Sequence, residues 1–94
     1  MSVDTVNYAL TNVRMRFQRN PENFSLWGLR KLLAICDCMR DLLMRGDVAG
    51  FDAYVNSVLT GEPDAADFIL EELFYELGFP KGVREQLDAA LAAE

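Results

Sequence analysis

The sequence predicts an all-α protein, a compact single-domain bundle of about five short helices with the helix near residues 25–45 at its centre. Apolar residues recur at spacings of three and four, the period of an amphipathic helix. Gly and Pro separate these periodic segments, and no segment shows the alternation of a strand. The 94 residues are 51% hydrophobic, which suffices for one modest core and excludes a disordered chain.

The first two helices are predicted over residues 4–18 and from about residue 21 or 25 to residue 45. Asn20-Pro21 ends the first, because the residue before a proline resists the helical conformation. In the second, apolar residues cover roughly half of the circumference, which predicts the central position. Gly46 suits the left-handed residue that follows a last helical turn. The apolar stripe of the first helix is Val3, Val6, Leu10, Val13 and Phe17.

Three further helices are predicted over residues 48–59, 65–77 and 82–92. Asp47 and Asp64 are the expected N-caps of the third and fourth helices, and Asp67 would complete a pair like a capping box with Asp64. Gly61 and Gly78 are expected to end these two helices. The core stripe of the fourth is Ala66, Ile69, Leu70, Leu73 and Leu77.

Charge is segregated along the chain. Residues 1–45 hold seven basic and four acidic residues, a net +3, whereas residues 46–94 hold two basic and eleven acidic, a net −9. Residues 46–80 contain eight carboxylates and no Lys or Arg. This asymmetry indicates a partner with a basic surface. A pI near 4.5 disfavours direct binding to nucleic acid or to an anionic membrane.

The residues of common catalytic and metal sites are missing. There is no histidine, the commonest general base and metal ligand at neutral pH. No phosphate-binding glycine loop occurs, and the spacing of Cys36 and Cys38 does not match a zinc site. We interpret both cysteines as buried, reduced thiols of a cytoplasmic protein. The sequence therefore predicts no enzyme activity, no cofactor, no metal and no membrane insertion.

The fourth helix carries the main candidate binding surface. Phe68 and Tyr75 fall among its carboxylates and outside its core stripe, and an aromatic pair ringed by charge is typical of an interface. The alternative is that both rings pack under the third or fifth helix and the acids are merely solvated. The predicted partner-binding residues are Asp64, Asp67, Phe68, Glu71, Glu72, Tyr75 and Glu76.

The first helix offers a second surface, for a partner or for a dimer, opposite its apolar stripe. Its residues are spaced by four, three and four, and Tyr, Met and Arg are enriched at interfaces. The alternative is that Tyr8 and Met15 touch a neighbouring helix. The surface consists of Tyr8, Asn12, Met15 and Arg19.

Two side chains of the second helix also require partners. Arg40 lies at the edge of the apolar stripe, so it must pair or reach solvent. We expect an ion pair with a carboxylate of the third or fourth helix. Trp27 is expected to cover the end of the first helix, the alternative being an exposed anchor.

These patterns predict a non-enzymatic protein-binding module that docks its acidic, aromatic helix face onto a basic groove of a larger protein, for example one that handles nucleic acids. Small acidic helical proteins of phages and mobile elements act in this way, as inhibitors similar to anti-CRISPR proteins, because their carboxylates satisfy the Lys and Arg that normally bind phosphates. The alternative is a homo-oligomeric helical adaptor, such as a homodimer in which residues 1–45 of one subunit, with a net +3, face residues 46–94 of another, with a net −9. A toxin-immunity-type protein without nucleic-acid mimicry is a further alternative.

Overall fold

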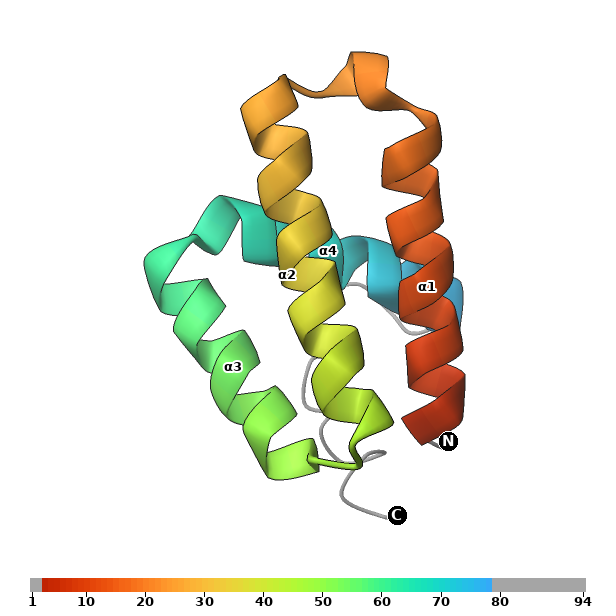
Figure 1. The fold of residues 1–94 in the computed structure, drawn as a ribbon, viewed down its shortest axis with the longest axis vertical. Helices are drawn as coiled ribbons and strands as arrows, with labels where there is room; N and C mark the ends of the chain where they lie inside the picture. Colours follow the sequence, from red (N-terminus) through yellow and green to blue (C-terminus); the bar gives the residue numbers. More distant parts are fainter. Residues whose placement is uncertain (1–2, 79–94) are drawn as a thin grey trace.

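The computed structural model describes residues 3–78, which form a compact all-α arrangement (Figure 1). This confirms the predicted fold class. The fifth expected helix, over residues 82–92, lies outside the described residues. The elements are α1 (Val3–Arg19), the short 3-10 turn η1 (Pro21–Asn23), α2 (Leu26–Met44), α3 (Val48–Gly61) and α4 (Pro63–Leu77).

Helix α2 occupies the central position that its wide apolar stripe predicts. Figure 1 shows α2 between α1 and α3, with α4 crossing behind the other helices. Both α2 and α4 contact each of the other three helices. Helix α4 is therefore, like α2, in contact with all the other α-helices of the described residues. Its outward face forms the back of the bundle in this view.

The core consists of the predicted helix stripes. Every buried side chain among residues 3–78 is hydrophobic. In α1 the whole stripe from Val6 to Phe17 is buried, together with Ala9. In α4 the buried set includes Phe74, which the predicted stripe omits. Since each helix buries one face and leaves the opposite face exposed, the outer faces of α1 and α4 are the places to look for a binding surface.

The turn between α2 and α3 follows its predicted chemistry. Gly46 has φ 72°, a conformation that costs other residues about 1–2 kcal/mol. The Asp47 side chain caps α3 by accepting a hydrogen bond from the Gly50 N–H at 2.8 Å. The segment Arg45-Gly46-Asp47 is thus a helix end followed by a helix start.

The expected capping role of Asp64 is wrong. Helix α4 begins at Pro63, and Glu62 stands at the N-cap position without a side-chain capping bond. Proline is favoured at the first helical position because its φ is preset and its missing N–H would have no partner there. Asp64 lies in the first turn instead, where the helix dipole still favours its charge. Helix α4 ends as predicted, at Gly78 with φ 77°.

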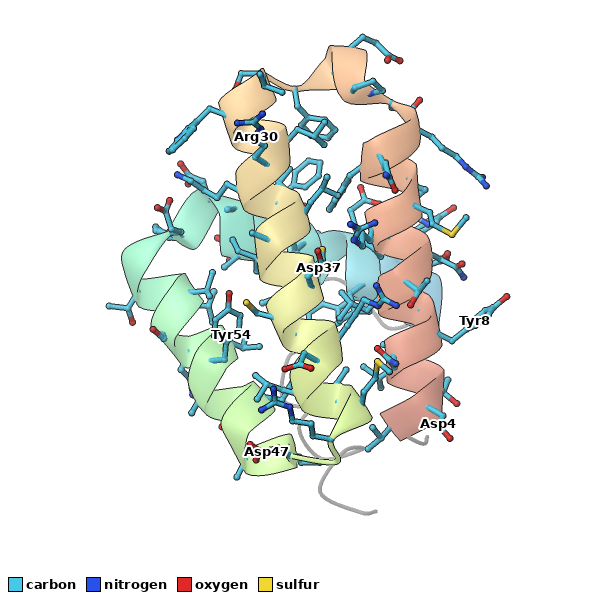
Figure 2. All side chains as sticks on the ribbon, viewed as in Figure 1. Asp4, Tyr8, Arg30, Asp37, Asp47 and Tyr54 are labelled. Atoms are coloured by element: carbon cyan, nitrogen blue, oxygen red, sulfur yellow. The ribbon has the colours of Figure 1, made fainter. Side chains whose placement is uncertain are left out.

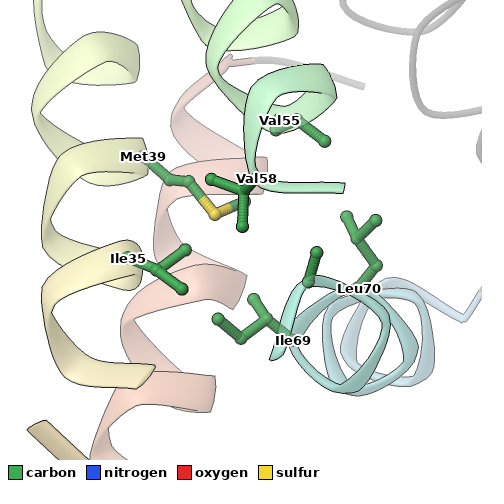
Figure 3. A pocket seen from close by; sticks show the side chains of 7 residues that line it. Ile35, Met39, Val55, Val58, Ile69 and Leu70 are labelled. Carbon is green, nitrogen blue, oxygen red and sulfur yellow. The ribbon is translucent and has the colours of Figure 1, made fainter. Parts of the chain in front are cut away.

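A small apolar void lies where α2, α3 and α4 meet (Figure 3). Its volume is about 10 Å³, and an apolar lining gives a water no hydrogen-bond partner. The void is therefore a packing gap and not a binding site. Its lining is Ile35, Met39, Val55, Val58, Ala66, Ile69 and Leu70.

No helix within residues 3–78 is both long enough and apolar enough to cross a membrane.

Candidate binding surface on helices α4 and α1

The outward side of α4 carries a stripe of alternating acidic and aromatic residues, which we call the α4 outer stripe: Asp64, Phe68, Glu71 and Tyr75. Their spacing of four, three and four residues places them on one face of the helix, opposite the buried Ile69 and its neighbours. Tyr75 is 80% exposed and Phe68 is 40% exposed. The neighbouring Asp67 is also exposed. The stripe thus combines a protruding aromatic side chain with carboxylates.

Glu72 and Glu76 belong to a different environment, although the sequence groups them with the stripe. The guanidinium of Arg16 on α1 donates to Glu72 Oε2 at 2.9 Å and to Glu76 Oε1 at 2.8 Å. These carboxylates therefore hold α4 against α1. The predicted seven-residue patch divides into an outer stripe and an ion-pair cluster, which we call the Arg16 cluster (Arg16, Glu72 and Glu76).

The Arg16 cluster keeps a surplus of negative charge. Burial alone would lower the pKa of Arg16, but the hydrogen bonds and charges of Glu72 and Glu76 outweigh it and raise that pKa above its ordinary value. Arg16 is therefore cationic at any physiological pH. Two carboxylates share one guanidinium, so the cluster carries a net charge of about −1.

Phe68 forms part of a three-ring cluster beside the Arg16 cluster. Its ring centroid lies 5.4 Å from that of Phe17 on α1 and 5.9 Å from that of Phe24, which follows η1. Phe17 and Phe24 lie 5.7 Å apart. Phe68 is therefore a partly exposed member of a ring cluster and not a protruding anchor. Its ring neighbours come from α1 and the η1 segment, and the alternative of packing under the third helix finds no support in these contacts.

A surface hollow of about 280 Å³ lies between α1, η1 and α4. Its lining consists of three aromatic rings, which we call its floor, and four polar or charged side chains, which we call its rim. The sequence pattern did not predict this hollow, because its lining residues are up to 56 positions apart, from Arg16 to Glu72. The lining residues are Arg16, Phe17, Asn20, Asn23, Phe24, Phe68 and Glu72.

No family model, no curated protein and no solved structure matches this chain.

The predicted second surface on α1 is largely exposed. Tyr8 is 71% exposed and extends away from the bundle in Figure 2. Met15 is 37% exposed, Arg19 is exposed and Asn12 is partly buried. At 100° per residue, Asn12 lies between Tyr8 and Arg16 around the helix. The α1 surface and the α4 outer stripe therefore flank the Arg16 cluster from its two sides.

The segregated charges of the sequence meet in the fold. Arg16 reaches Glu72 and Glu76, and Lys31 Nζ lies 3.1 Å from Glu62 Oε2. Both contacts join the basic first half of the chain to the acidic second half. Part of the charge segregation in the sequence is thus neutralised by ion pairs within the protein. For Asp64 and Asp67, by contrast, no ion pair occurs among the described residues.

Two expectations for α2 are wrong. Trp27 does not cover the end of α1, because it is 73% exposed and lines a separate hollow with Arg30 and Lys31. Arg40 does not pair with a carboxylate of α3 or α4. Its ion pair is with Asp37 of its own helix, at 3.7 Å, because a residue three positions earlier is the nearest carboxylate that the helix surface offers.

The two cysteines face different environments, as their spacing on a helix requires. Cys36 is buried as expected, but Cys38 is exposed. Burial, reinforced by the charge of Asp37, raises the pKa of Cys36 to about 12. Within residues 3–78 no three side chains of His, Cys, Asp or Glu are grouped so as to hold a metal ion.

Proposed function

We propose that this protein is a non-enzymatic binding module that docks the α4 outer stripe, together with Asp67, onto a basic surface of a larger protein. The observation that carries the proposal is Tyr75, which is 80% exposed on a helix face shared with carboxylates. Tyr is enriched at interfaces and among the residues that contribute most to binding, above all where a charged rim surrounds it.

Electrostatics favour a basic partner. The chain has a net charge of −6. Asp64 and Asp67 are exposed within about one helical turn of Phe68, and Glu71 lies one turn from Tyr75 on the same face. Rim carboxylates steer a cationic surface toward the aromatic centre and disfavour partners that carry negative charge. A nucleic-acid-handling protein supplies such a surface, and the carboxylates would then take the place of phosphates, as in an inhibitor of phage or mobile-element type.

A homo-oligomeric adaptor is the second candidate. It is favoured by the exposure of Tyr8 and Met15 on α1, which a second copy would bury. Light scattering over a range of concentrations separates the two functions. A monomer at all concentrations argues against the adaptor, and a dimer whose formation is abolished by Tyr8→Ala supports it.

Charge reversal on α4 tests the docking function. The variant Asp64→Lys with Asp67→Lys should lose the partner proteins that the tagged wild type captures from the native host. Its matched control is Asp4→Lys with Glu22→Lys, which makes the same change in net charge at exposed positions outside α4. Both variants should keep the helical circular dichroism of the wild type, since all four positions are exposed.

Capture should also weaken as salt rises from about 0.1 M to about 0.5 M, because exposed charges are then screened. Tyr75→Ala should reduce capture without altering this salt dependence, since it removes the aromatic anchor and leaves the carboxylates. If the α4 variant recovers the same proteins as the wild type in the same amounts, the docking proposal is wrong.

A further inference from the structure

The hollow between α1, η1 and α4 has the size and chemistry of a site for one side chain. Its volume of about 280 Å³ equals the space of roughly nine water molecules. It opens beside Phe68, at the edge of the α4 outer stripe. We propose that it binds an arginine side chain of the basic partner, an inference that rests on the proposed function and specifies the group that this face recognises.

The floor of the hollow suits a flat cation. The rings of Phe17, Phe24 and Phe68 lie 5.4–5.9 Å apart, two of the three pairs in edge-to-face geometry, so they hold one another in place. Phe68 is 40% exposed and presents part of its ring to the hollow. The negative faces of aromatic rings attract cations, and a planar guanidinium can also stack on them.

The rim of the hollow supplies hydrogen-bond acceptors. Glu72 uses Oε2 to bind Arg16, which leaves Oε1 for another donor. Asn20 uses its Nδ2 to donate to the Arg16 carbonyl oxygen at 2.8 Å, which leaves its Oδ1. Asn23 also lines the hollow, and its side-chain amide carries a further acceptor oxygen. A guanidinium carries five N–H donors in one plane and no acceptor, which complements such a rim.

Arg16 is the one cation at the rim, and it does not reverse the sign of the site. Its guanidinium is bound by two carboxylates, so the Arg16 cluster remains at about −1. An incoming cation therefore meets a net negative rim above an aromatic floor. An anionic group would meet the carboxylate of Glu72 and the net negative charge of the Arg16 cluster, and an apolar group would leave the rim acceptors unused.

Titration with a small arginine derivative tests the site directly. Nα-acetyl-arginine methylamide should shift the NMR signals of the three Phe rings and of the Asn20 and Asn23 side-chain amides, saturably and in the millimolar range expected for one side chain. The lysine and norleucine derivatives are the comparison ligands. Lysine should bind more weakly, because its ammonium cannot stack, and norleucine should leave these signals unchanged.

Two variants separate the floor from the rim. Phe68→Leu keeps an apolar side chain but removes the ring, and it should weaken arginine binding about two- to fivefold. Glu72→Gln keeps the shape of the rim and removes its charge, and we expect a loss of about threefold or more. Glu22→Gln is the matched control, because it also removes one exposed carboxylate but lies outside the hollow, and it should not change the affinity.

The inference is overturned if the norleucine derivative shifts the same signals as strongly as the arginine derivative, which would mark a merely apolar hollow. It is also overturned if no ligand shifts them, or if Glu72→Gln binds arginine like the wild type. If arginine fails to bind while Asp64→Lys with Asp67→Lys still abolishes capture, the hollow is wrong and the docking function stands. If arginine binds while the α4 variant captures normally, the hollow is an arginine site and the docking function is wrong.

Discussion

The ion pairs of Arg16 offer the sharpest test of how α1 and α4 are held together. Replacing Arg16 by Met keeps an unbranched apolar stem and removes the charge. The change leaves Glu72 and Glu76 without their shared partner. Because these two carboxylates are four positions apart on one helix, they then repel each other.

The expected cost follows from the exposure of the three groups. Their side chains are 37%, 35% and 22% exposed, so each pair contributes at most about 1 kcal/mol, as partly solvated pairs do. Glu76 is the least exposed of the three, so its ion pair should contribute more of the stabilisation than that of Glu72. Adding a few tenths of a kcal/mol for the repulsion, Arg16→Met should lower the free energy of unfolding by about 1–2 kcal/mol at most, a fall in Tm of about 5–10 °C.

Urea unfolding of a mutant cycle measures this coupling. Arg16→Met, Glu72→Gln and Glu76→Gln are compared singly and together. The triple variant should be more stable than Arg16→Met alone, because it no longer holds two like charges side by side. The coupling should shrink between about 0.1 M and 1 M salt. Strictly additive effects at low salt would refute the view that Arg16 ties α4 to α1.

Two other predictions follow from burial and backbone geometry. At pH 8 a thiol reagent should modify Cys38 in the folded protein and spare Cys36, which is buried. Burial raises the pKa of Cys36 from 9.0 to about 12, so above pH 9 the unfolded chain loses a proton that the folded protein retains. The free energy of unfolding should therefore fall by about 1.4 kcal/mol per pH unit from there, and a shallower slope in Cys36→Ala identifies the group responsible. Gly46→Ala should cost about 1 kcal/mol in urea unfolding, because φ is 72° although a Cβ would meet no atom within 4 Å; an unchanged stability would show that the turn can relax.

Local features of the fold could be predicted from the sequence because their causes are local. The stripe of α1, the Asp47 cap and the left-handed Gly46 and Gly78 depend on residues within one or two turns. The predicted start of α4, with Asp64 as its N-cap, is wrong because two local signals compete there. Asp favours the N-cap position and Pro favours the first helical position, and the preference of Pro63 prevails.

The candidate surface was harder to predict because its parts are distant in sequence. The exposure of Tyr75 follows from its position opposite the core stripe. The engagement of Glu72 and Glu76 does not, since Arg16 lies 56 and 60 positions away and only the crossing of α4 behind α1 brings them together. The same crossing creates the hollow at Phe68. The exposure of Trp27 likewise depends on how far α1 extends beside α2, which helical periodicity does not specify.

The Gly46 turn divides residues 3–78 into two helical hairpins of opposite charge, +3 before it and −8 from it onward. The Arg16 and Lys31 ion pairs form across this division. During synthesis the cationic hairpin emerges from the ribosome first, with its apolar stripes uncovered. Within the Debye length of about 8–10 Å, opposite net charges favour the approach of the anionic hairpin. The charge pattern of the gene thus favours the correct pairing of the two halves over the pairing of like halves from neighbouring chains.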